Sequence, residues 1–313
     1  MKYFSVYIIF IMHKTRRQHY VPRTYLRGWA EKEKLYCLRD NHIFSVSIEN
    51  IAQKRDYYRL EPLNSQALSL INTFISKAPI AIKAQFEEIV SLLSVIPISY
   101  EEIKKKGEDK ELFRKIDVMV NNTIENLYSS IEGKATPCLN CLRSGNLEFW
   151  KDEELFLDFI TFVILLFTRT PKKEMEAKKC MEAIYHSGWR IISIIVALGV
   201  TYNINANYEK WKITLLINNT QTPFITSDQP VINLSQIHGE KVTEFVAYMP
   251  ISPLYSVIIA KDDNGDRLIY NNITENDVKR YNQRMKEESS EILLSNNDEI
   301  LKEFMGNSMD ETT

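Results

Sequence analysis

Two strongly apolar stretches in the middle of the chain limit the fold most. Residues 155–167 and 191–200 contain mainly large apolar side chains, and charged residues bound each stretch. A membrane-spanning helix needs about 20 apolar residues, so both are too short to cross a bilayer. A helix that is apolar around most of its surface lies inside a protein. The two stretches therefore predict a pair of buried core helices.

Strand-like patterns lie on both sides of this helical middle. Residues 35–38 and 43–48 flank the turn sequence RDNH and predict a β-hairpin. After the helices, WKITLLI predicts a strand, and TPFITSDQPVINL predicts a second strand interrupted by Asp228-Gln229-Pro230. LYSVIIA and RLIY predict another hairpin, because the Asn-Gly between them suits a tight turn.

The remaining segments add helices and complete the order of elements. Residues 63–93 are apolar at helical spacing with a break at Pro79, and residues 101–117 are charged enough to form an exposed helix or a linker. Thr274 and Asp277 form a capping pattern at the start of a helix, after which EILLS predicts a last strand. The order predicts one α+β domain over residues 12–313: a short N-terminal β-hairpin, a long helical middle, and a C-terminal antiparallel sheet with a helix.

Both ends of the chain differ in composition from the rest. The first eleven residues, MKYFSVYIIFI, imitate a signal peptide, but no small-residue cleavage site follows. We expect an over-extended reading frame with the native start at Met12; a membrane-associated N-terminus is the alternative. Residues 297–313 hold five acids and one lysine, which predicts a frayed acidic tail.

Charge and cysteine content restrict the environment and the partners. The formal charge is −2, so the whole chain has no general attraction for nucleic acid or membranes. Residues 12–30 are an exception, with five Lys or Arg and no acid. Four cysteines in a chain of this length suit a reducing cytosol, so we expect a cytoplasmic protein without membrane partners.

The most informative segment is RRQHYVPRTYLRGWA, which lies within the basic stretch. Pro22 favours an extended Val21 and can open a helix that ends near Gly28. A histidine beside this helix start and near arginines has a lowered pKa, so His19 suits a general base. Arg23 suits binding of a phosphate or carboxylate. The alternative is a structural histidine with exposed arginines.

Other candidate residues lie at the ends of predicted elements. FITSDQPV places Thr226, Ser227 and Asp228 where a strand becomes a turn, and a plain turn is the alternative. In RDYY, Asp56 either orients His19 or pairs locally with Arg55. Arg169 ends the first apolar helix, where it either reaches the site or complements the helix dipole.

Several familiar types of site have no pattern here. The pair Cys138 and Cys141 is a lone C-x-x-C without further zinc ligands, and DDNGD does not continue as a calcium loop. The chain has no glycine-rich phosphate loop, no G-x-S-x-G and no H-E-x-x-H. We therefore expect no cofactor and no bound metal as the first hypothesis.

Seven segments together resemble a bacterial family of unknown function, domain of unknown function 4238, known for a His-Tyr-Val-Pro motif. The segments run in order from about His19 to Ser295: QHYVPRTYLRGW, NIAQKRDYY, SSIEGKATPCL, FVILLFTRTP, FITSDQPV, MPISPLYSVII and YNQRMKEESSEILLS. The resemblance implies that residues 75–120 are a helical insertion, and it fits a start at Met12. It implies no activity. The motif positions are His19, Tyr20, Pro22, Arg23, Asp56, Arg169, Thr226, Ser227, Asp228 and Pro230.

The first functional hypothesis is a hydrolase that cleaves a phosphodiester, such as a ribonuclease-like toxin or defence effector. His19 acts as general base or acid, and Asp56 or Asp228 orients it. Arg23 and Arg169 bind the phosphate. Tyr20, Thr226 and Ser227 complete the substrate site. The reaction needs no metal; a variant of the hypothesis places a divalent cation on the two aspartates.

Two further classes of function use the same residues without catalysis. In the first, Tyr20 and the arginines bind a nucleotide or another anion, and the protein acts as a sensor. In the second, residues 12–30 form a basic arm on nucleic acid. The sequence leaves open whether the protein is an enzyme.

Overall fold

The apolar stretches form two adjacent helices, α5 (Glu153–Thr168) and α7 (Ser187–Asn205), which pack against each other in the computed structural model. The structure describes residues 13–107, 109–180, 187–235, 244–262 and 265–306. The prediction about the first eleven residues lies outside this part. Helix α5 begins at Asp152, whose side chain accepts hydrogen bonds from the backbone nitrogens of Glu154 and Leu155. The prediction of core helices is confirmed.

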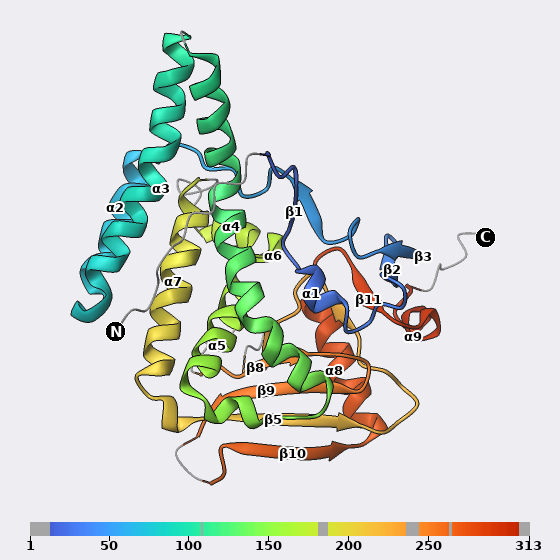
Figure 1. Ribbon diagram of the computed structural model, residues 1–313. Coiled ribbons are helices and arrows are strands. Elements are labelled where there is room, and N and C mark those ends of the chain that lie inside the picture. The colour runs from blue at the N-terminus through green and yellow to red at the C-terminus, as the bar shows by residue number, and fades with distance from the viewer. Residues whose placement is uncertain (1–12, 108, 181–186, 236–243, 263–264, 307–313) are drawn as a thin grey trace.

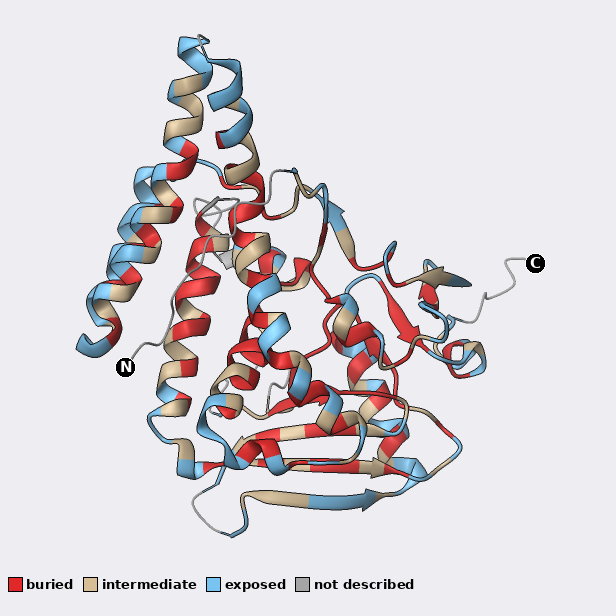
Figure 2. Cartoon of the chain, in the orientation of Figure 1, coloured by how far each residue is buried: buried red, intermediate tan, exposed pale blue. Residues whose placement is uncertain are grey.

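Four further helices surround this pair: α2 (Ser65–Lys77), α3 (Ile80–Lys106), α4 (Lys110–Arg143) and α6 (Pro171–Cys180). Helix α3 begins directly after Pro79, as predicted. Within the charged segment, residues 101–106 end α3 and residues 110–117 begin α4, and these ends of the two helices project from the molecule (Figures 1 and 2). That residues 75–120 are an insertion stays a prediction.

A five-stranded sheet underlies the helical layer, in the order β10-β5-β9-β8-β7 (Figure 1). Its strands are β5 (Trp211–Asn218), β7 (Ile232–Asn233), β8 (Ala247–Pro250), β9 (Tyr255–Lys261) and β10 (Leu268–Ile273). The predicted hairpin of LYSVIIA and RLIY is wrong, because β5 lies between β9 and β10 and pairs with β10 in parallel. The chain leaving β9 therefore crosses to the far side of β5 instead of turning back.

A four-stranded antiparallel sheet, β3-β2-β11-β6, joins the two ends of the chain. The predicted N-terminal hairpin is confirmed as β2 (Lys34–Arg39) and β3 (His42–Ser47), and EILLS supplies β11 (Leu293–Ser295). The single interrupted strand predicted for TPFITSDQPVINL is wrong. Its two halves, β6 (Thr226–Ser227) and β7, belong to different sheets, because the Asp-Gln-Pro turn redirects the chain between them.

Short elements complete the α+β fold. Strand β1 (Arg17–His19) pairs with β4 (Gln53–Arg55), and α1 is the short helix Arg23–Leu26. Helix α8 (Glu275–Glu288) begins with the predicted capping box of Thr274 and Asp277. The predicted frayed tail is wrong for its first part, because residues 298–302 form helix α9 and bury Ile300 and Leu301. Residues 307–313 lie outside the described part.

The hydrophobic core links these layers. One cluster of buried side chains runs from Tyr20 through the helical middle to Leu294, and a second one lies under α8. Figure 2 shows the buried residues concentrated along α5, α7 and the facing strands. Within the described ranges, none of the helices combines the length and apolarity that crossing a bilayer requires.

Candidate functional site

The His19 segment is fixed to the C-terminal sheets by the aromatic side chains that follow it. The Tyr25 hydroxyl donates to the backbone oxygen of Pro250 at 2.7 Å and lies 2.8 Å from Thr226 Oγ1. The Trp29 indole nitrogen donates to the backbone oxygen of Phe224 at 2.9 Å. Both rings are buried. Since buried polar atoms gain most when they are paired, these bonds hold α1 in one position.

A polar cleft of about 560 Å³ opens between this segment and the middle of α4. That volume lies within the range of small-molecule sites. Its lining combines basic, acidic and hydroxyl side chains from β1, α1, the loop after β3, and α4. The lining residues are Thr15, Arg17, His19, Arg23, Thr24, Arg27, Glu49, Glu125, Asn126, Ser129, Ser130 and Glu132.

The His19 side chain lines this cleft. Its Nε2 is buried and has no hydrogen-bond partner among the residues that the structure describes. The nearby backbone of Glu49 and Ile48 acts to raise the pKa of the ring. Burial and the positive charge of Arg23 outweigh this and lower the pKa of His19 below its ordinary value. The predicted direction is therefore confirmed, with burial as the largest cause. The ring is neutral at pH 7 and can accept a proton at Nε2.

Glu125 is a candidate that the sequence reasoning missed. Burial, together with the charge of Glu132, raises the pKa of Glu125 to about 7. At neutral pH a large share of this carboxyl is therefore protonated and can donate a proton. One sequence signal was present: Glu125, Ser129 and Glu132 have the spacing of one helix face.

Three arginines lie along the N-terminal wall of the cleft. Arg17 donates to Asn50 Oδ1 at 2.9 Å, and Arg27 forms an exposed ion pair with Glu33. Arg23 is exposed and forms no ion pair with the described residues. Exposed ion pairs contribute about 0–1 kcal/mol, so these guanidinium groups can turn to an anionic ligand at low cost.

Arg169 lies behind the cleft and does not line it. The guanidinium donates to Glu132 Oε1 at 2.8 Å and to the backbone oxygen of Tyr20 at 3.1 Å, and it stacks on Tyr128. Its side chain is 2% exposed. Burial acts against its charge, but Tyr58 and Glu132 raise the pKa of Arg169 above its ordinary value. The predicted phosphate contact is therefore corrected: Arg169 is occupied in fixing the cleft wall.

Tyr20 also differs from its predicted role in substrate binding. Its ring is 2% exposed and packs edge-on against Tyr57, with Lys54 over both rings. Burial and the charge of Asp228 raise its pKa. The side chain faces the core while His19, one residue earlier, faces the cleft, which is the alternation expected in extended backbone.

The two aspartates assigned to His19 are each occupied elsewhere. Asp56 pairs with Arg16 at 2.9 Å and Arg55 at 3.7 Å, which matches the alternative of local pairing. Asp228 accepts the backbone N–H groups of Ser290 and Glu291 at 2.9 and 2.7 Å. Neither carboxylate lines the cleft. The prediction that both converge with His19 is wrong, because each is used in a local turn or loop contact.

Thr226 and Ser227 are buried parts of the sheet and do not line the cleft. Thr226 pairs with the Tyr25 hydroxyl, and Ser227 Oγ accepts from the backbone nitrogen of Gln229 and contacts Met285 Sδ. Their predicted contact with substrate is corrected: they hold α1 and the turn after β6.

Two further observations restrict the site. Among the described residues, no group of three or more His, Cys, Asp or Glu side chains is arranged to hold a metal ion.

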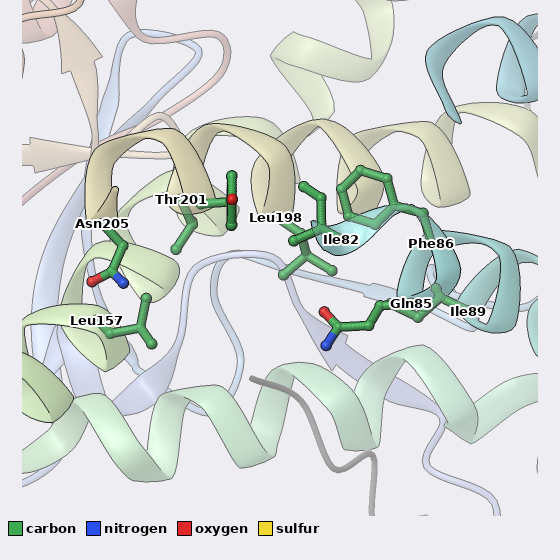
Figure 3. Close-up of a pocket in the computed structure, with 9 residues that line it drawn as sticks. Ile82, Gln85, Phe86, Ile89, Leu157, Leu198, Thr201 and Asn205 are labelled. Atoms are coloured by element: carbon green, nitrogen blue, oxygen red, sulfur yellow. The ribbon is translucent and has the colours of Figure 1, made fainter. Parts of the chain in front are cut away.

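A second pocket lies between α3, α5 and α7 (Figure 3), but its volume is about 20 Å³, which is room for one water. Ile82, Phe86 and Leu198 make it largely apolar. The polar cleft is much larger and contains His19, so it is the candidate site.

The fold and this cleft define an α+β protein with a polar site beside an arginine-flanked histidine. A family model described as a protein of unknown function, DUF4238, matches residues 17–189 and 196–299. Because the match covers most of the chain, the protein belongs to the DUF4238 family. Neither curated proteins nor solved structures gave a match.

Proposed function

We propose that the cleft cleaves phosphodiester bonds in RNA without a metal ion, with His19 and Glu125 as the acid–base pair. The observation that carries the proposal is the unpartnered Nε2 of His19 in a cleft that also contains Glu125 and three arginines. Around neutral pH the imidazole is ready to accept a proton and the carboxyl is ready to donate one.

The residues suit a transesterification within the substrate. His19 Nε2 takes the proton of the ribose 2′-hydroxyl, whose oxygen attacks the adjacent phosphorus. The bond from phosphorus to the 5′-oxygen breaks, and Glu125 gives its proton to that oxygen. The products are a 2′,3′-cyclic phosphate and a 5′-hydroxyl. The arginines of the cleft wall stabilise the charge on the phosphoryl oxygens.

The arrangement replaces the aspartates of the first hypothesis with a residue of α4. Asp228 and Asp56 already bind backbone or arginine partners, whereas Glu125 lines the same cleft as His19. General acid–base catalysis contributes about 10²–10⁴-fold per group, so removing either group has a large effect on rate.

The test is cleavage of an oligoribonucleotide by the wild type, His19→Ala and Glu125→Gln. We expect cyclic-phosphate products from the wild type and a loss of about 10²-fold or more in each variant. The matched controls are His42→Ala and Glu148→Gln, both exposed and outside the cleft. Cleavage that survives both cleft substitutions contradicts the proposal. Thermal stabilisation by a nucleotide without turnover identifies the sensor alternative instead.

A further inference from the structure

The arginines of the cleft are arranged in a row. Arg17 lies two residues before His19 in β1, so both side chains point to one side of the strand about 6–7 Å apart. Arg23 and Arg27 are four residues apart at the two ends of α1, which places them about 5–6 Å apart on one helix face. Three positive charges therefore line the same cleft, and along the chain His19 lies between the first and the second.

A row of charges matches a chain of phosphates better than one phosphate. A single terminal phosphate is held most tightly by donors that converge on it. Here Arg17 and Arg27 have different present partners, Asn50 and Glu33, at separate places on the wall. Both partners are exposed, so the arginines lose little free energy when they exchange these bonds for bonds to phosphate oxygens.

The acidic residues of the cleft do not cancel the positive charge of this row of arginines. Glu132 is neutralised by its bond to Arg169. Glu125 carries reduced negative charge at neutral pH because of its raised pKa. Glu49 remains as an exposed acid in a cleft that also holds three arginines.

The cleft also offers little for reading bases. No aromatic side chain is among its described lining residues, so successive bases have no stacking platform there. Hydroxyl and amide groups of Ser129, Ser130 and Asn126 face the same space and suit sugar and phosphate oxygens. Recognition of the backbone without base preference follows from this lining.

We propose that the cleft binds a single-stranded polynucleotide along its backbone, contacting about three phosphates without selecting bases. This rests on the proposed function for the site and its phosphate ligand. A single strand is favoured over a duplex because the 2′-oxygen must come into line with the breaking bond, which a stacked A-form helix prevents.

The experiment is fluorescence anisotropy on the full chain with labelled deoxyoligonucleotides of about eight nucleotides, within the range of known single-strand sites. DNA lacks the 2′-hydroxyl, so binding is measured without cleavage. We expect oligo-dT and oligo-dA to bind within about threefold of each other, because their backbones are the same. The logarithm of the binding constant should fall with the logarithm of salt concentration with a slope of about −2, as for three phosphates.

Variants and competitors separate the outcomes. Arg23→Gln should reduce the salt slope by about 0.7, whereas the exposed Arg280→Gln on α8 should leave it unchanged. Equal competition by a mononucleotide, preference for a duplex of the same length, or a slope of about −0.7 overturns the inference. If DNA binds as expected but RNA is not cleaved, the proposed function fails and this inference stands.

Discussion

Arg169 Nε donates a 3.1 Å hydrogen bond to the backbone oxygen of Tyr20, which joins residues 149 positions apart in the chain. Tyr20 follows His19 directly, and the Tyr58 hydroxyl donates to the backbone oxygen of His19 at 3.3 Å. The backbone that carries the imidazole is therefore held in place by the end of α5 and by the loop after β4. Arg169 therefore holds the backbone next to His19 and is not among the residues that line the cleft.

Replacing Arg169 by methionine should destabilise the fold by up to about 3–5 kcal/mol, because it removes a buried guanidinium and leaves the half-buried carboxylate of Glu132 without its partner. Urea unfolding measures the loss. The double variant Arg169→Met with Glu132→Gln should recover part of the stability, since no unpaired charge remains. A double variant as unstable as the sum of the single variants contradicts this interpretation.

The substitution Asp228→Asn should lower the free energy of unfolding and leave the rate of RNA cleavage unchanged. The asparagine amide group faces one of the two N–H groups that the carboxylate now accepts, so a loss of about 1–3 kcal/mol is expected. Asp40→Asn at the exposed hairpin turn is the control and should be close to neutral. A variant that is fully stable but inactive would return Asp228 to a catalytic role.

The proposed acid–base pair predicts a bell-shaped pH profile. The base must be deprotonated, so the rate rises with pH through the lowered pKa of His19, below 6.5. The acid must be protonated, so the rate falls as pH rises through about 7, the pKa of Glu125. Measuring kcat/KM from pH 5 to 9 tests both limbs. Activity that keeps rising above pH 8 excludes Glu125 as the acid.

Gly28→Ala should destabilise the attachment of α1 to the sheet. A Cβ at this position would lie 2.2 Å from the backbone oxygen of Ile251, which cannot move aside as a flexible side chain does. We expect a loss of about 1–3 kcal/mol in thermal or urea unfolding. The control is Gly133→Ala in the exposed middle of α4, where a Cβ meets nothing within 4 Å. It should gain up to about 1 kcal/mol.

The local features of the fold, including the hairpin of β2 and β3, could be predicted from the sequence, whereas the pairing of strands distant in the chain could not. Apolar runs and the Thr274 cap determine helices through contacts within a few residues, and these predictions are confirmed. The position of β10 beside β5 depends on packing between distant segments. The Asn-Gly turn sequence therefore led to the wrong prediction of a hairpin between β9 and β10. The prediction of a frayed acidic tail was wrong for residues 298–302. It was based on the number of acidic residues and did not consider that Ile300 and Leu301 could be buried by a short helix.

The site residues that are close together in the sequence could be predicted, whereas those contributed by distant segments could not. His19 and Arg23 were found because the chemistry of neighbouring residues in one segment is visible in the sequence. Glu125 was not found, because its raised pKa results from burial beside Glu132 on α4, and only the folded chain shows this. Asp228 looked catalytic because strand ends often carry such residues, but a loop contact uses it fully.

His19, whose pKa is lowered, and Glu125, whose pKa is raised, line one cleft, and NMR titration of the two side chains tests this most directly. We expect a pKa below 6.5 for the His19 ring that rises in Arg23→Gln, and a pKa near 7 for the Glu125 carboxyl. A His19 pKa above 6.5 that Arg23→Gln leaves unchanged, or a Glu125 pKa near its ordinary 4.5, would contradict it.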